Sequence, residues 1–425
     1  MKCKKIPYLI VLILVFACLL CIGGCGMGGE PEYALLSTGN VSADGTFTYN
    51  VYENRTAVIT GGTANDVCLT IPAMIDGYPV VEIGDDAFAG NTSIGYLVLG
   101  ENVRKISFAA FNGCQALIRV DATPALRVVG SGAFGGCTAL CEIVGATKLE
   151  SIDESAFFQC TSLIKAPLPE TLRTVGSQAF YGCSSLTEIA LPAKIESLGD
   201  GVFGFCESLC RVDLGGLTYL PENTFQRCTS LCKIEIGKSV TAIGESAFRG
   251  CFALSEITGA KNVSNVGYCV FEETAWLDEQ TDEFVLFGKG ILLRYNGSST
   301  EVTVPRGVSM IAEAFCDNDT VKSITVPAGV TKIGSAAFSG CGQLSRVVLG
   351  KNVTEIADTA FASCSALSYV YLPKSLTYIG NSAFNGCLLL STVSYGGSAR
   401  DWAKITVENG NTPLALAELA TGKKA

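Results

Sequence analysis

The sequence contains no histidine. This absence excludes Ser-His-Asp triads, Cys-His pairs and metal sites built on imidazole ligands. An enzyme would have to rely on a rarer arrangement, such as a Ser-Lys pair or two carboxylates, and no pair of acids stands out because most of them occupy repeated positions. We therefore expect a protein that is not an enzyme, with no catalytic residue and no cofactor.

Positive charge is also scarce. The chain has 30 Lys and Arg against 40 Asp and Glu, and only 16% of its residues are charged. No basic run with interleaved aromatic residues occurs, and a net negative surface repels phosphate backbones. We expect no binding of nucleic acid. The apolar fraction of 48% is that of a chain folded throughout.

Only one long hydrophobic run is present, and it lies at the N-terminus. Three lysines within residues 1–5 precede an apolar stretch over residues 8–22, which is the anatomy of a secretory signal peptide. This stretch is shorter than the roughly 20 residues that a membrane-spanning helix needs, so a retained membrane helix is the less favoured alternative.

Ile22-Gly23-Gly24-Cys25 resembles the lipobox of bacterial lipoproteins. The resemblance implies that residues 1–24 are a lipoprotein signal peptide and that Cys25 is lipidated. Cys18 and Cys21 lie inside the apolar run and are poorer sites. Acyl chains on Cys25 would anchor the protein to a membrane, and residues 25–32 would form a flexible tether. We expect an exported, membrane-anchored lipoprotein at the bacterial cell surface.

Phenylalanine recurs with a fixed period over most of the remaining chain. The step is 23 residues in all but two intervals, one of 22 and one of 44. Ile, Val, Leu or Met stands five residues before each of these phenylalanines, and Leu usually follows six residues after it. The thirteen positions are Phe88, Phe111, Phe134, Phe157, Phe180, Phe203, Phe225, Phe248, Phe271, Phe315, Phe338, Phe361 and Phe384.

Each unit is predicted to form one coil of a repeat solenoid. The segment that follows the phenylalanine, as in Leu344-x-x-Val347-x-Leu349, should be a short strand with its apolar residues inward. Three apolar residues cannot form a core alone, so successive units must stack as a parallel ladder. We expect about 13 rungs of 23 residues, mostly β with turns and short helical segments.

The pattern Ile-Gly-x-x-Ala-Phe-x-Gly-Cys-x-x-Leu-x-x-Val-x-Leu-Pro, from about residue 67 to 395, resembles the BspA-like leucine-rich repeat of bacterial surface proteins. The resemblance implies a curved solenoid with a parallel sheet, export to the cell surface and attachment to host or bacterial partners. We expect repeats at 81–273 and 301–395, a β cap at 33–80, and a C-terminal cap and tail at 396–425.

The interval of 44 residues marks an insertion at 274–300. It contains Trp276, Phe284, Phe287 and Tyr295 with a short apolar patch. We interpret it as a hairpin that packs on one face and bends the solenoid. A projection that contacts a ligand is the alternative, because insertions in repeat arrays map to loops on one face.

Ten of the sixteen cysteines after Cys25 stand three residues after a repeat phenylalanine. We interpret them as small buried thiols, because a ladder cannot pair most of its members as disulfides. Cys210 and Cys232 share a second column in adjacent units and are candidates for a disulfide. With Cys206 and Cys228 they give a spacing near the looser zinc patterns, but the repeat register alone generates it, so we expect no metal site.

Residues 130–135 read Gly-Ser-Gly-Ala-Phe-Gly, which matches the dinucleotide-binding fingerprint. That fingerprint needs a strand before it and a helix after it. Here the glycine and the Ala-Phe pair belong to repeat columns and no βαβ unit surrounds them. We expect no nucleotide binding.

The outward side of the strand ladder is the predicted working surface, since solenoids present an extended concave face. Its charges nearly alternate in sign, which a stabilising cross-strand charge ladder would explain. The functional alternative is a strip that binds a protein partner through tyrosine anchors. The residues are Tyr96, Arg119, Glu142, Lys165, Glu188, Arg211, Lys233, Glu256, Arg346, Tyr369 and Tyr371.

The sequence as a whole favours a cell-surface binding or adhesion protein whose ligand is a host or bacterial surface protein. A structural spacer of the envelope without a specific ligand is the second hypothesis. A carboxylate-using enzyme that acts on glycans is the least favoured.

Overall fold

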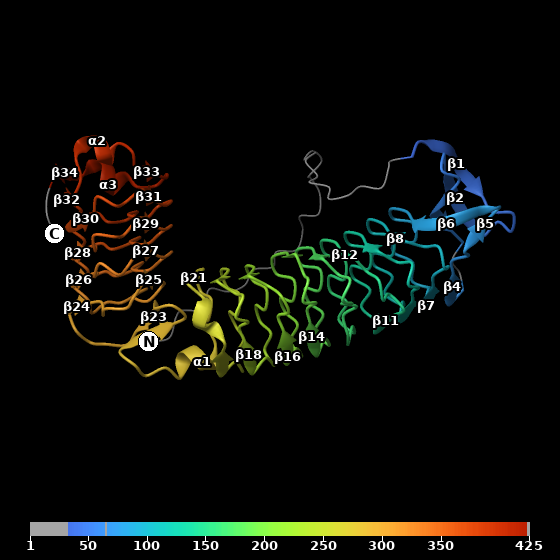
Figure 1. Cartoon of the computed structure of the whole chain (residues 1–425), viewed down its shortest axis with the longest axis horizontal. Helices are drawn as coiled ribbons and strands as arrows, with labels where there is room; N and C mark the ends of the chain where they lie inside the picture. Colours follow the sequence, from blue (N-terminus) through green and yellow to red (C-terminus); the bar gives the residue numbers. More distant parts are fainter. Residues whose placement is uncertain (1–32, 64–65, 423–425) are drawn as a thin grey trace.

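The computed structural model describes residues 33–63 and 66–422, so Cys25 and the export signal lie outside the described residues. The chain coils into a β-solenoid with parallel strands and very little helix, which confirms the predicted leucine-rich repeat solenoid (Figure 1). It has about 16 turns. The thirteen phenylalanine rungs are extended by β3 (Ala57–Gly62), β23 (Ile291–Tyr295) and β33 (Thr406–Val407), whose strands lack the repeat phenylalanine.

Most rungs contain two strands rather than the one expected. The strand that follows the phenylalanine forms the predicted ladder and is usually three residues long. We call this the outer ladder, and its members are β4 (Cys68–Thr70), β7 (Tyr96–Val98), β9 (Arg119–Asp121), β11 (Glu142–Val144), β14 (Glu188–Ala190), β16 (Arg211–Asp213), β18 (Lys233–Glu235), β20 (Glu256–Thr258), β24 (Glu301–Thr303), β26 (Ser323–Thr325), β28 (Arg346–Val348), β30 (Tyr369–Leu372), β32 (Thr392–Tyr395) and β34 (Glu418–Thr421).

The second strand precedes the phenylalanine and in most rungs ends at the Ile, Val or Leu five residues before it, whereas β25 has Met310 at this position and ends one residue later. Most of these strands have only two residues. We call them the inner ladder: β6 (Tyr78–Ile83), β8 (Lys105–Ile106), β10 (Val128–Val129), β12 (Ser151–Ile152), β13 (Thr174–Val175), β15 (Ser197–Leu198), β17 (Tyr219–Leu220), β19 (Ala242–Ile243), β21 (Asn265–Val266), β25 (Met310–Ile311), β27 (Lys332–Ile333), β29 (Glu355–Ile356) and β31 (Tyr378–Ile379), with β23 and β33.

The turn that carries the phenylalanine forms a third hydrogen-bonded side. The backbone N–H groups of Asp86, Phe88 and Gly90 each donate to a carbonyl of the next rung, at 2.7 to 2.9 Å. Asp86 and Gly90 have positive φ, and the same positions keep positive φ in most rungs. The residues with positive φ point every second N–H group of the turn toward the following rung. The backbone groups of each turn are therefore hydrogen-bonded to the neighbouring turns.

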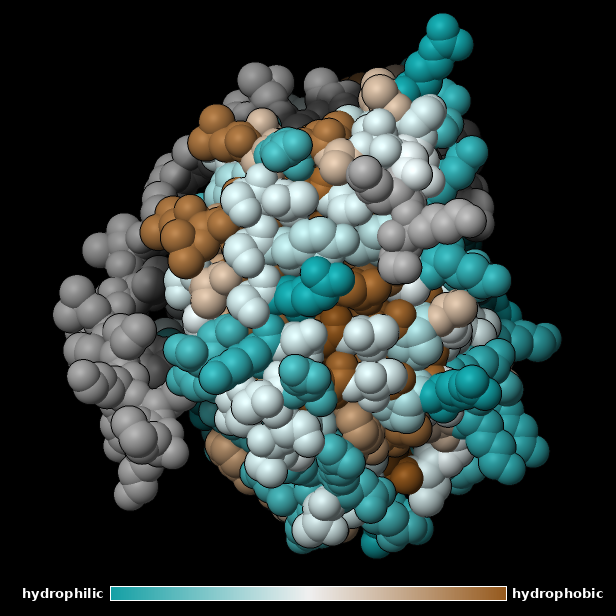
Figure 2. All heavy atoms as spheres, turned by 90° about the vertical axis from the view of Figure 1, so that its left-hand side faces the viewer, coloured by the Kyte–Doolittle hydropathy of each residue, from teal (hydrophilic) through white to brown (hydrophobic). Residues whose placement is uncertain are grey.

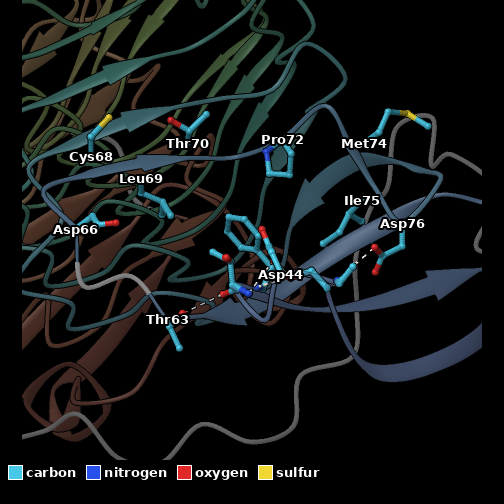
Figure 3. A pocket seen from close by; sticks show the side chains of 14 residues that line it. Asp44, Thr63, Asp66, Cys68, Leu69, Thr70, Pro72, Met74, Ile75 and Asp76 are labelled. Carbon is cyan, nitrogen blue, oxygen red and sulfur yellow. Dashed lines mark hydrogen bonds between the residues drawn. The ribbon is translucent and has the colours of Figure 1, made fainter.

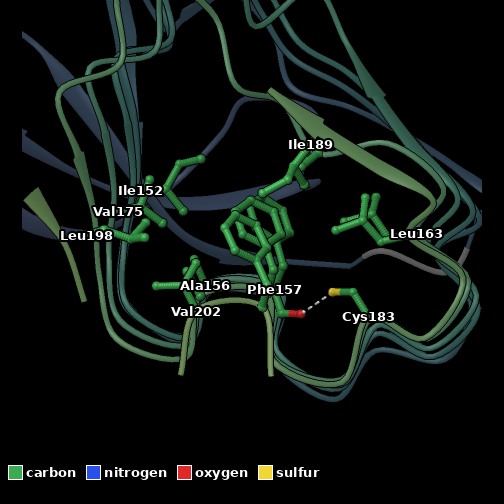
Figure 4. Packing of buried hydrophobic residues seen from close by; sticks show 14 of the residues in the cluster. Ile152, Ala156, Phe157, Leu163, Val175, Cys183, Ile189, Leu198 and Val202 are labelled. Carbon is green, nitrogen blue, oxygen red and sulfur yellow. Dashed lines mark hydrogen bonds between the residues drawn. The ribbon is translucent and has the colours of Figure 1, made fainter. Parts of the chain in front are cut away.

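The phenylalanines stack along the solenoid axis. Neighbouring rings lie 5.0 to 5.7 Å apart between centroids and are close to parallel in two runs, Phe88 to Phe271 and Phe315 to Phe384. Figure 4 shows Phe157 between the inner-ladder residues Ile152 and Val175 on one side and Leu163 on the other. The ring therefore fills the space between both ladders and the turn.

The cysteines three residues after the phenylalanines are buried free thiols, as predicted. Each thiol donates a hydrogen bond to the phenylalanine carbonyl of the preceding rung; Cys183 to Phe157 is one example, at 3.2 Å. The same contact recurs in all ten members at 3.0 to 3.3 Å. A small apolar side chain with a weak donor suits this position.

The insertion forms α1 (Ala275–Asp278) and an antiparallel hairpin of β22 (Phe284–Phe287) with β23. On the inner side, β23 pairs with β25, and the backbone N–H of Lys289 donates to the carbonyl of Val263 at 2.7 Å. On the outer side, β20 and β24 belong to separate sheets. Figure 1 shows that the solenoid bends at this segment, with the inner ladder on the inside of the bend and the outer ladder on the outside. On the inner side, β21 and β23 also belong to separate sheets, so the insertion interrupts both ladders and the solenoid bends toward the inner one.

Both ends are closed by non-repeat segments. At the N-terminus, β1 (Leu35–Val41) and β2 (Phe47–Tyr52) pair antiparallel ahead of β3, and the short β5 (Met74–Ile75) pairs with β6. At the C-terminus, α2 (Ala399–Trp402) and α3 (Thr412–Leu416) cover the last rung. The Asn411 amide oxygen accepts from the backbone N–H of Phe384 at 2.9 Å, in place of a further rung.

Both caps and both hydrophobic clusters lie within the described residues. A fragment that begins at Gly26 therefore contains the whole described fold.

Glu313 replaces a backbone acceptor at the bend. In the regular array the N–H of Ser246 donates to the carbonyl of Tyr268 in the next rung at 2.8 Å. One rung later the N–H of Cys269 donates instead to the Glu313 carboxylate at 3.1 Å. Burial raises the pKa of Glu313 to about 7, although this hydrogen bond lowers it. The acid therefore joins the two arrays in a partly desolvated place.

We expect the contribution of Glu313 to the free energy of unfolding to fall as the pH rises from about 4 to 7. The folded chain holds a proton on Glu313 in this window, whereas an unfolded Glu has a pKa of roughly 4.3 and has released it. Glu313→Gln keeps an acceptor for Cys269 and removes the titration. Between pH 5 and pH 8, the free energy of unfolding of Glu313→Gln in urea should rise by ~1–2 kcal/mol relative to that of wild type. The change is limited to this size because the site is partly exposed to solvent. The exposed Glu273→Gln is the control. Parallel pH profiles for wild type and Glu313→Gln would contradict this role.

Thiol reactivity should follow burial. Burial raises the pKa of Cys114 to about 11 and of Cys251 to about 12, and their column is closed to solvent. In a fragment from Gly26 onward, we expect a thiol reagent at pH 8 to modify Cys68, Cys210 and Cys232 first, because these three are exposed. The phenylalanine-column thiols should react only after unfolding.

The double variant Cys210→Ser, Cys232→Ser should lower the number of rapidly modified thiols by two. The thiols of Cys210 and Cys232 are free in this structure. If the number of rapidly modified thiols in the wild-type fragment rises by two when reductant is added, the predicted disulfide between them exists.

Candidate binding surfaces

The predicted working strip lies on the outer ladder. All of its charged residues except Lys165 begin three-residue strands, but Figure 1 places those strands on the outside of the bend. The expectation of a concave strip is therefore wrong. Its physical reason is the insertion, where both ladders are interrupted and the two arrays turn toward the inner ladder.

Charges in this strip are paired with one another. Arg119 contacts Asp121 at 2.6 Å and also Glu142 in the next rung. Lys165 lies in register with Glu188, Glu188 contacts Arg211 at 3.5 Å, and Lys233 contacts Glu256 at 2.5 Å. All are exposed or partly exposed, so each pair contributes little to stability. The geometry fits the interpretation as a cross-strand charge ladder.

The three tyrosines of the strip have different environments. Tyr96 is 43% exposed at the start of β7. The Arg346 guanidinium lies 4.2 Å from the centre of the Tyr369 ring, a cation–π contact between neighbouring rungs. Tyr371 is buried, so the prediction that it is a surface anchor is wrong. Its hydroxyl lies where a side chain on Gly396 would clash, which shows that the segment after β32 covers it.

The candidate zinc pattern does not converge. Cys206 and Cys228 point into the core and donate to the carbonyls of Phe180 and Phe203, whereas Cys210 and Cys232 are exposed. No group of three or more acids and cysteines in residues 33–63 and 66–422 could hold a metal ion.

The outer ladder has one hollow that the sequence analysis missed. Pro167 stands where a strand residue would continue from Lys165, and a proline cannot donate to the ladder. Only an isolated bridge between Lys165 and Glu188 spans the gap between β11 and β14. The hollow of about 480 Å³ has an apolar floor with Leu168 and Val212. The proline within a predicted strand was the available signal.

A hollow of about 420 Å³ lies at the N-terminal cap, between β4 and the turns around β5 (Figure 3). Asp44, Asp66 and Asp76 line it, but they lie apart from one another in this view. The Tyr49 hydroxyl donates to Asp76 at 2.8 Å, and the Ser42 hydroxyl donates to Asp44 at 2.5 Å. These carboxylates are already used to order the cap.

The inner ladder presents a polar face that sequence reasoning did not single out. Its hydroxyl groups donate to the backbone of the preceding rung, as Thr331 does to Ser309 at 3.3 Å and Thr354 to Thr331 at 3.1 Å. Their oxygen lone pairs are left for solvent or a ligand. Charged residues pair between rungs here too: Lys105–Glu82, Arg127–Glu150, Arg173–Glu196 and Lys332–Glu355.

The inner faces of the two arrays meet in a hollow at the bend, which we call the elbow. Its volume is about 640 Å³, and its walls come from Asn265 of the first array, Lys289 of the insertion, and Lys332 and Glu355 of the second. Tyr219, 45% exposed, lies two rungs before Asn265 on the same ladder, and Tyr378 lies one rung after Glu355. The bend itself creates this site, so a linear periodicity could not reveal it.

No helix within residues 33–63 and 66–422 is long and apolar enough to cross a membrane. The predicted lipid anchor at Cys25 stays a prediction.

Comparisons with known proteins agree with the repeat. The family model for the BspA type leucine-rich repeat region, six copies, matches residues 81–184, 150–277 and 293–408. The search of curated proteins found no match.

Similar solved structures include a leucine-rich repeat protein from Bacteroides ovatus, 22% identical, covering 89% of this chain and 98% of that one, with a TM-score of 0.47. A leucine-rich cell surface protein from Faecalibacterium prausnitzii is 26% identical over 87% of this chain and 98% of its own, with a TM-score of 0.43. A leucine-rich repeat protein from Eubacterium ventriosum is 20% identical over 91% and 95%, with a TM-score of 0.44. Because the family model covers well over half of the sequence, the chain belongs to the BspA-type leucine-rich repeat family.

Proposed function

We propose that this protein is exported, is anchored to the cell surface through lipidated Cys25, and binds a protein partner on its inner face. The observation that carries the proposal is the elbow, where two polar arrays converge on a hollow of about 640 Å³. Two surfaces that face each other can contact a partner from both sides, which raises the buried area for a given footprint.

The composition of the elbow favours a protein ligand. Tyr219 and Tyr378 flank it on the two arms, and tyrosine is among the residues that dominate protein interfaces. Lys289 is exposed and lies beside the Lys332–Glu355 pair, so the hollow contains charges of both signs and many hydroxyl acceptors. A polypeptide offers the matching amide donors and charged side chains. Ion pairs between rungs occur on the outer strip as well, so it is the facing arrangement of the two inner arrays that distinguishes the elbow.

The test compares three forms of the fragment that begins at Gly26. The inner variant is Tyr219→Ala with Lys289→Glu, and the outer variant reverses Arg119, Lys165, Arg211 and Lys233 to Glu. Each form is used to capture envelope and host-matrix proteins, and the affinity for any saturable partner is then measured. We expect the inner variant to lose at least about tenfold in affinity, or ~1.4 kcal/mol, and the outer variant to match wild type.

The reverse pattern, with loss only in the outer variant, would move the site to the predicted strip. A wild-type fragment with no saturable partner in either source would contradict a binding function and favour the envelope spacer. Both variants change exposed or partly exposed side chains, so equal thermal unfolding of all three forms is the folding control.

A further inference from the structure

Exposed leucines gather at the C-terminal end of the solenoid. Leu388 is 82% exposed, Leu389 63% and Leu416 81%. The first two stand four and five residues after Phe384, positions that are occupied by Ser365 and Ala366 in the preceding rung. These leucines are therefore not part of the buried core that the repeat forms.

Two apolar hollows flank α3 at the same end. One, of about 310 Å³, lies between the last rung and α3 and is lined by Leu388, Leu390, Pro413 and Leu416. The other, of about 260 Å³, is lined by Trp402, Val407, Leu414 and Leu419. Figure 2, which views the second array from its outer side, shows apolar surface patches at the level of the C-terminal cap. Protruding leucines and apolar hollows thus occur together on one end face.

The outer ladder also ends here. Among residues 33–63 and 66–422, β34 is the last strand of its six-stranded sheet and pairs with β32 alone, so its other edge offers backbone donors and acceptors. If two copies of β34 paired antiparallel about an axis between Leu419 and Ala420, Glu418 would face Thr421 and Leu419 would face Ala420. No like charges would oppose each other in that register.

We propose that two copies of this chain associate through their C-terminal caps about a two-fold axis. An isologous contact needs one surface that is complementary to itself. In the proposed contact, the β34 edges pair and Leu416 of one copy enters the hollow lined by Trp402 and Leu414 of the other. Burial of the protruding leucines is the driving force.

The expected contact is modest in strength. Stable dimers bury about 800 Å² on each partner, and an exposed apolar patch on a monomer is roughly 300–600 Å². The leucines would form the centre, and the polar rim of the cap would supply the rest. The association is independent of the proposed protein ligand, because the elbow lies at the bend and not at this end.

The experiment is sedimentation velocity on the fragment from Gly26 to Ala425 over concentrations of about 1 to 100 µM, the range in which a micromolar dimer forms. We expect a reversible monomer–dimer equilibrium. Leu388→Ser with Leu416→Ser should raise the dissociation constant at least tenfold without a change in thermal unfolding, since both side chains are exposed. The control is Leu286→Ser, an exposed leucine on the insertion.

A wild-type chain that stays monomeric throughout would overturn the proposal, and so would a dimer that Leu388→Ser with Leu416→Ser leaves intact. Co-sedimentation of a monomeric chain with phosphatidylcholine–phosphatidylglycerol vesicles, lost in the same variant, would overturn it in favour of a lipid contact. Because neither Tyr219 nor Lys289 lies at this end, the inner variant should dimerise like wild type, which separates this proposal from the binding function.

Discussion

The interlock of each phenylalanine turn with the turns before and after it is the contact on which the solenoid depends. The ring stacks on its neighbours, the backbone around it donates to the next rung, and its carbonyl accepts from a cysteine thiol of that rung. The two ladders on the other sides have strands of only two to four residues in most rungs, which could not hold their register alone. Apolar burial and backbone satisfaction coincide at the turn, and the repeat preserves both.

Because the repeat residues form the core, the features available for function are the surfaces of the solenoid and the places where the repeat is interrupted. The core positions are taken up by the repeat, and the charges of the outer ladder largely neutralise one another. The insertion interrupts both ladders, and the bend at this place brings the two inner faces together around Lys289 and Lys332. The last rung departs from the pattern at Leu388 and Leu389. Both proposals rest on such departures.

Much of the fold could be predicted from periodicity. The phenylalanine step, the strand after it and the buried thiols follow from residue spacing alone. The inner ladder could not be assigned, because strands such as β8 have two residues and show no alternation. The side toward which the solenoid bends depends on where α1 and β22 insert between rungs, which is a three-dimensional fact. Tyr371 has the sequence signature of an exposed anchor and is buried because a later segment crosses it.

The most direct test of the interlock is the free energy of unfolding of Phe180→Ala against Phe252→Ala, measured in urea on the fragment from Gly26. Phe180 is fully buried between two stacked rings, whereas Phe252 is 51% exposed. The account predicts a loss of about 3–5 kcal/mol for Phe180→Ala, the range for a buried phenylalanine, and a much smaller loss for Phe252→Ala. Equal, small losses in the two variants would contradict it.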